Sequence, residues 1–320
     1  MPWSVSGQRF ATGRRLSRVQ YLGIPLAILG AVLMSVSAML QHRGVARVDA
    51  AGSGNGSEGL GISSFLRLLK SKTWLSGTLL LGLAVVCQLS ALLFSPLVIV
   101  QPIGVISLVL TAIITARQSG MRIAGRKALA ITLCVAGVGG FVAVASSVAV
   151  DTKITEPQLV VVLIILAALV VLLGIVFAIV RRTKWRSLFY VVAGGVMYGF
   201  LVTLAKVVLA RWLQGEYGWY FLACVIGVVV SLLVGGYFVQ TAYASSSADL
   251  VIAGLTVIDP IVAVTIGIVV LRETEGASVL VNVLFILLGA LAVAGVFLLQ
   301  LAQSDDEVSA VRKHAIGEAN

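Results

Sequence analysis

One carboxylate of this chain lies near the middle of a long apolar segment. Asp259 is flanked by apolar residues and is followed directly by Pro260. An ionisable side chain at membrane depth is costly, so it normally faces a partner or a cavity and is functional. Pro260 lacks an amide, which frees the carbonyl of Thr256 from its helical hydrogen bond. A carboxylate beside a free carbonyl indicates a cation or proton site, and the alternative is a structural aspartate bonded to a neighbouring hydroxyl.

A similar proline-containing motif lies earlier in the chain. Residues 101–103 (QPI) match residues 259–261 (DPI), and Ser107 matches Thr265. If a cation is carried, we expect Asp259 to bind it together with the amide of residue 101. The candidate substrate- or ion-binding residues are Asp259, Pro260, Gln101, Pro102, Gln88, Ser107 and Thr265. Helix–helix hydrogen bonds explain the amide and hydroxyl groups of this set equally well.

The segments that hold these residues are too apolar for a soluble protein. The chain of 320 residues is 59% hydrophobic and 11% charged, whereas soluble domains are about 45–50% apolar and about 25% charged. Because a helix needs about 20 apolar residues to cross the hydrocarbon core, the sequence predicts an all-α membrane protein with about nine transmembrane helices. These segments are 21–41, 74–94, 97–116, 127–149, 158–180, 187–210, 218–240, 249–271 and 277–302.

The net charge of +10 reflects the orientation of the chain in a membrane and does not indicate nucleic-acid binding. Lys and Arg lie in short clusters between apolar segments, with 15 in the first, third and fifth connections and the C-terminal tail, against 3 in the second, fourth, sixth and eighth. This asymmetry predicts a multi-pass plasma-membrane protein with a cytoplasmic C-terminus. Four arginines of the N-terminal tail conflict with nine spans, since they favour the cytoplasmic side as well. They are Arg9, Arg14, Arg15 and Arg18.

The two proline motifs belong to a longer internal repeat. Each is followed by a glycine-containing segment that reads AGV, at 136–138 and at 294–296. Equivalent spans are five apart in order, and five crossings reverse the direction of the chain. The prediction is two inverted-topology repeats (4+1+4), a common basis of alternating access. The expected parts are an N-terminal tail at 1–20, a first repeat at 21–149 with a loop at 42–73, a connecting helix at 158–180, a second repeat at 187–302 and a C-terminal tail at 303–320, which we expect to be polar and frayed.

The second half of the chain resembles a known family. Residues 243–251 (YASSSADLV), with Pro260, Gly267 and Glu273, resemble the second EamA-type half of the drug/metabolite transporter superfamily. The nine-span layout and residues 100–107 (VQPIGVIS) are similar to its NIPA-like magnesium transporter branch. The first repeat departs from the second, because Thr115 stands where the counterpart of Glu273 would be.

The resemblance implies a secondary transporter that needs no cofactor. An enzyme is not expected, since the predicted spans hold no histidine and no carboxylate pair. A single central carboxylate favours a small solute or metabolite, with proton coupling as one option. A NIPA-like magnesium or divalent cation transporter, a lipid flippase and a non-transporting scaffold are the alternatives. The expected partners are a small solute or cation and membrane lipids, with a homodimer allowed and nucleic acid excluded.

Two further charged residues are expected at span ends. Lys206 lies about one turn from the end of its segment and is predicted to extend toward the membrane interface. Glu273 follows the span that contains Asp259, and we expect it to pair with Arg272 or Arg211 or to cap a helix.

Overall fold

The computed structural model describes residues 22–51, 70–118, 125–150, 154–183, 185–246 and 248–317, and this part of the chain is helical throughout its regular elements. Nine helical segments in it are long and apolar enough to cross a membrane, which confirms the predicted fold class. One of these spans is divided into two helices, α4 and α5. The helices are α1 (Gly23–Ala51), α3 (Lys72–Phe94), α4 (Leu97–Gly104), α5 (Ile106–Gln118), α6 (Arg126–Val148), α7 (Glu156–Val180), α8 (Arg186–Gln214), α9 (Trp219–Ser245), α10 (Ala248–Val269) and α11 (Val279–Gly317).

A proline accounts for one of the helix boundaries in the first half. The helix α3 ends at Phe94 because Pro96 disfavours helical backbone at Ser95, which is extended. Pro102 lies inside α4, and the helix is interrupted at Val105. Pro260 lies inside α10 as well, but that helix continues from Ala248 to Val269. The two matched prolines therefore lie in helices of different continuity.

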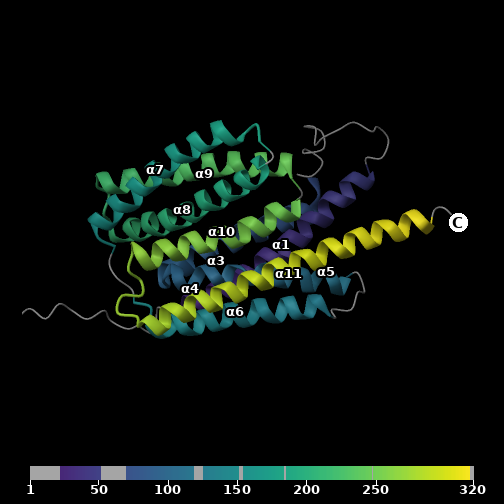
Figure 1. The fold of residues 1–320 in the computed structure, drawn as a ribbon, viewed down its shortest axis with the longest axis horizontal. Coiled ribbons are helices and arrows are strands. Elements are labelled where there is room, and N and C mark those ends of the chain that lie inside the picture. The colour runs from purple at the N-terminus through teal and green to yellow at the C-terminus, as the bar shows by residue number, and fades with distance from the viewer. Residues whose placement is uncertain are drawn as a thin grey trace, which may run out of the picture.

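The helices pack in corresponding ways in the two halves (Figure 1). The helix α1 packs along α3 as α8 packs along α9, and α4 and α10 meet each other in the centre. The fourth helices of the two repeats, α6 and α11, pack along each other. The helix α7, which connects the repeats in the sequence, packs on α9 and α8.

Glycines permit the closest of these approaches. A Cβ atom at Gly137 of α6 would lie 2.5 Å from the amide nitrogen of Ala292, and one at Gly295 of α11 would overlap the amide of Cys134. Each glycine thus meets the residue three positions before the other glycine. This reciprocal contact is the pattern that a two-fold arrangement produces, and the two glycines belong to the matched AGV segments of the predicted repeat.

Two helices extend beyond the predicted limits of their spans. The helix α1 continues to Ala51, into the expected loop at 42–73, because Gly44 packs closely against Trp74 and prolongs the α1–α3 contact. The helix α11 continues to Gly317, into the expected C-terminal tail, where no proline interrupts it. Both extensions leave the same end of the bundle (Figure 1). The rest of the loop, at 52–69, and the N-terminal tail lie outside the described residues.

Candidate functional site

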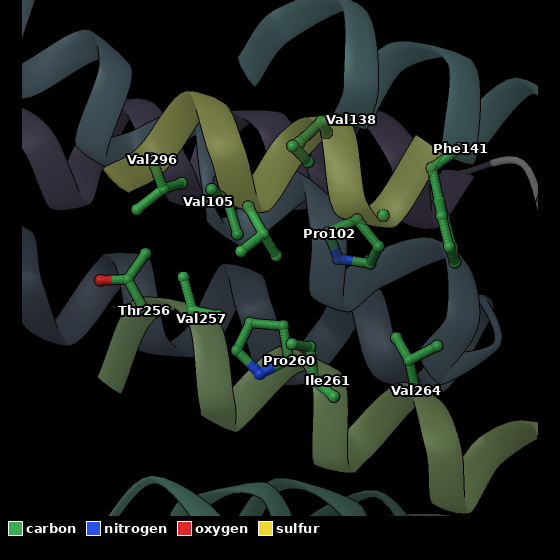
Figure 2. A pocket seen from close by; sticks show the side chains of 13 residues that line it. Pro102, Val105, Val138, Phe141, Thr256, Val257, Pro260, Ile261, Val264 and Val296 are labelled. Carbon is green, nitrogen blue, oxygen red and sulfur yellow. The ribbon is translucent and has the colours of Figure 1, made fainter. Parts of the chain in front are cut away.

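The two matched prolines line one pocket in the centre of the molecule. Pro102 of α4 and Pro260 of α10 lie on opposite walls of a cavity of about 90 Å³ (Figure 2). The remaining walls come from α6 and α11, and they include Phe141 and Val296. The lining side chains are apolar except for that of Thr256, and its hydroxyl donates to the carbonyl of Ile252 in its own helix. The structure thus brings together the prolines that the sequence pairs, around an apolar space.

Asp259 lies next to this pocket but is not part of its lining. Its backbone is at the crossing of α10 and α8, where a Cβ atom at Gly199 would stand 3.0 Å from the Asp259 carbonyl oxygen. Gly195, one turn earlier, lies against Ile258 and approaches the Asp259 amide. The side-chain oxygen Oδ1 is buried and has no hydrogen-bond partner in the described part of the chain. A buried polar atom normally has a hydrogen-bond partner, so Oδ1 is a candidate position for a ligand or a proton.

Two of the predicted polar residues gather at the interruption between α4 and α5. The hydroxyl of Ser107 donates to the carbonyl of Gly104 at 2.8 Å, and the Ser107 carbonyl accepts from Ser35 of α1 at 2.7 Å. Gln88 of α3 reaches the same place, with its amide nitrogen 3.7 Å from a Cβ built on Gly104. Interrupted helices at membrane depth leave backbone carbonyls that can coordinate cations.

The structure places the two remaining polar candidates, Gln101 and Thr265, at other positions. Gln101 is partly buried in α4, one residue before the proline of the pocket. Thr265 lies on an exposed face of α10, where its hydroxyl donates to the carbonyl of Ile261 at 2.7 Å. The structure therefore does not bring Thr265 to the pocket, although it matches Ser107 in sequence.

A second polar cluster, which we name the clasp, joins the two halves at one end of the bundle. The clasp consists of Glu273, Lys206 and the backbone amides of Leu97 and Val98. The Lys206 ammonium lies 2.6 Å from Oε1 of Glu273, and both side chains are buried, with 10% and 4% of their surface exposed. The amides of Leu97 and Val98 donate to the two carboxylate oxygens of Glu273 at 3.0 Å each. The carboxylate thereby caps α4, a helix of the first repeat, where a negative charge complements the helix dipole.

A tight turn after α10 directs Glu273 inward. Arg272 adopts a positive φ of 56°, and the Glu273 amide donates to the carbonyl of Gly267 at 2.9 Å. Gly267 is also required for space, because a Cβ there would lie 2.9 Å from Oε2 of Glu273. Gly267 and Glu273, two of the residues on which the family resemblance rests, thus form one structural unit.

The clasp corrects two predictions from the sequence. Lys206 is buried against a carboxylate instead of extending to the interface. Glu273 pairs with neither of the predicted arginines, since Arg211 binds Glu216 and Arg272 binds Glu275. The capping alternative is correct, but the capped helix belongs to the other repeat. No residue-type signal pointed to this pair, because charged side chains near span ends ordinarily reach water.

The nine spans of the described residues, in two corresponding halves with paired prolines at the centre, fit the layout of the drug/metabolite transporter superfamily that the sequence resembles. A family model for the magnesium transporter NIPA matches residues 18–305. The chain therefore belongs to the NIPA magnesium transporter family, which lies within that superfamily and consists of transporters rather than enzymes. Both parts of the resemblance drawn from the sequence are thereby confirmed.

Two relatives of this chain are named as magnesium transporters. An uncharacterized protein of Corynebacterium glutamicum is 24% identical over 253 residues, which cover 79% of this chain and 85% of the relative. The human magnesium transporter NIPA4 is 26% identical over 196 residues, or 58% of this chain and 46% of its own length. The mouse magnesium transporter NIPA4 is 25% identical, with the same coverage. The chain thus aligns with about half the length of the two mammalian relatives. No solved structure matches.

Proposed function

We propose that this protein carries Mg²⁺ across the plasma membrane by alternating access of its two repeats, with Asp259 as the charged ligand. The observation that carries this proposal is the buried Oδ1 of Asp259 at the α10–α8 crossing, which has no partner among the residues that the structure describes, in a chain of a magnesium transporter family. The clasp closes one end of the bundle across the repeats. Opening toward that end therefore requires either that the hydrogen bonds between Glu273 and α4 break or that the clasp residues and α4 move together.

The ligand set suits a cation that keeps most of its water. Mg²⁺ holds several waters and binds proteins through one or two carboxylates rather than through an all-protein cage. No group of three or more His, Cys, Asp and Glu side chains gathers within the described residues. A hydrated ion with one charged contact to Asp259 fits this arrangement, with Gln101 and the carbonyls near Gly104 as ligands through water.

A small organic solute is the second candidate, because the proline-lined pocket is apolar. Ligand pockets usually measure about 300–1,000 Å³, whereas this cavity is about 90 Å³. The pocket would have to open considerably before it held a drug-sized molecule. The family membership and this small volume together favour the ion over the solute, which reverses the order of the two candidates drawn from the sequence.

Flux into proteoliposomes tests the proposal. The purified protein is reconstituted with a fluorescent Mg²⁺ indicator inside the vesicles, and Asp259→Asn is expected to lower the initial rate about tenfold or more because it removes the only charge of the ligand set. Glu275→Gln is the matched control, since Glu275 is an exposed acid at 60% side-chain exposure. An imposed pH gradient in the same vesicles tests coupling to protons.

The outcomes separate the candidates. Saturable Mg²⁺ flux that Asp259→Asn leaves unchanged would remove Asp259 from the ion path. Absence of Mg²⁺ flux with saturable uptake of an organic cation would favour the second candidate. A folded protein without flux of either kind would support the scaffold alternative.

A further inference from the structure

A polar cavity of about 210 Å³ lies beside the clasp, at the end of the bundle where the even-numbered connections meet. Its polar lining consists of Lys206, Arg211, Gln214 and Glu273, and apolar residues such as Leu92 and Leu213 complete the walls. Most of the lining residues lie within four positions of the ends of α3, α7, α8 and α10, and Lys206 lies eight positions before the end of α8. The cavity is therefore at the depth where the spans emerge from the apolar core of a membrane.

Hydrogen-bond donors in this cavity lack acceptors. Arg211 is only 8% exposed, and its guanidinium binds Glu216 through one terminal nitrogen at 3.0 Å, whereas its Nε is buried without a partner in the described part of the chain. An ammonium group has three N–H donors. Glu273 accepts from Lys206 once, and that ammonium forms no further protein bond within the described residues.

The neighbouring carboxylates do not supply the missing acceptors. The two oxygens of Glu273 already accept from Lys206, Leu97 and Val98. The side chain of Glu216 is 53% exposed, so water weakens its attraction for Arg211. A ligand with several oxygen acceptors would satisfy these donors, and a negative charge on it would suit Arg211, whose counter-ion is largely exposed. A phosphate group has these properties, and arginine binds it through paired N–H donors.

We propose that this cavity binds a phosphate group through Arg211, Lys206 and Gln214. The group is carried either by a phospholipid head or by free inorganic phosphate. The apolar walls and the position at the span ends suit a phospholipid, whose acyl chains would continue between the helices. This site is separate from Asp259 and does not depend on the identity of the transported ion.

Lipid binding to the intact protein tests the site. The full chain is purified in detergent, and native mass spectrometry measures retention of added phosphatidylglycerol and phosphatidylcholine, while a thermal-shift series measures the effect of inorganic phosphate. Arg211→Gln is expected to weaken binding about tenfold or more, because it removes a charged hydrogen-bond donor. Arg272→Gln is the matched control: Arg272 is an arginine of the same end of the molecule, but it is 67% exposed and lies outside the cavity.

Each result decides between the sources or against the site. Retention of phospholipid without an effect of phosphate assigns the site to lipid heads, and the reverse assigns it to free phosphate. If Arg211→Gln does not fold, Gln214→Leu at the exposed end of α8 serves instead, with a several-fold loss expected. Equal binding by the wild type and the cavity variants, or no binding of any phosphate compound, would overturn the proposal.

Discussion

Glu273 connects three helices through one carboxylate. It lies in the turn after α10, pairs with Lys206 of α8 and caps α4 of the first repeat. Removing one partner of a buried ion pair leaves an uncompensated charge, which is much more damaging than losing a surface pair. The contribution of this residue is therefore structural for the whole bundle as well as local to the turn at Arg272.

Glu273→Gln should lower the stability of the protein strongly. The neutral amide leaves the Lys206 ammonium buried without a counter-charge, at a cost of about 3–5 kcal/mol. Glu275→Gln, which breaks an exposed pair with Arg272, should change stability by about 0–1 kcal/mol. Thermal unfolding in detergent, followed by light scattering or dye binding, measures both. Equal melting temperatures for the two variants would show that the clasp contributes little.

Residue types alone identified Asp259 but not the clasp. A carboxylate in the middle of an apolar segment is unusual enough to be found by inspection. Lys206 and Glu273 lie near span ends, where charged side chains ordinarily reach water, and 67 positions separate them in the chain. Only the packing of α8 against α10 shows that they meet, and that Glu273 turns inward.

At the scale of the helices, α6 and α11 depend on glycine for their close approach. The positions 137 and 295 each face backbone atoms of the other helix, which cannot move as a flexible side chain would. Gly139, on the same helix as Gly137, has no neighbour within 4 Å of a built Cβ atom. Replacement of glycine by alanine is therefore expected to affect stability differently at positions 137 and 139.

Gly137→Ala and Gly295→Ala should each destabilise the protein, whereas Gly139→Ala should not. Overpacking of a close contact costs about 1–3 kcal/mol, while alanine in an open helical position is favoured over glycine by up to about 1 kcal/mol. Melting temperatures of the three purified variants provide the comparison. A loss of stability in Gly139→Ala as large as in the other two would mean that helix flexibility, and not the α6–α11 contact, requires glycine.

The molecule as a whole has two chemically different ends. The even-numbered connections meet at one end, where Gln158 donates to the carbonyl of Leu271 and Val150 donates to that of Glu273. The cationic odd-numbered connections follow the opposite ends of the same helices, as at Arg182 after α7. On the charge asymmetry, we expect the clasp and the phosphate-binding cavity to face outward.

Single introduced cysteines test this orientation. Glu275→Cys should react in intact cells with a membrane-impermeant maleimide, and Arg182→Cys only after the membrane is opened. Both positions are exposed, and the three native cysteines, Cys87, Cys134 and Cys224, are buried and should stay silent. The opposite labelling pattern would place the C-terminus outside and would agree with the arginines of the N-terminal tail.

The amino-acid sequence by itself determined the nine spans of the described residues and the family, and it predicted two related halves. These properties depend on the cost of placing polar groups in hydrocarbon and on repeated motifs, which are local along the chain. Tertiary structure decided which polar residues meet: it separated Asp259 from the apolar pocket, placed Thr265 on an outer face and buried Lys206 against Glu273. The reason is that the direction of a side chain depends on which face of its helix a neighbour covers, and contacts between distant helices set that face.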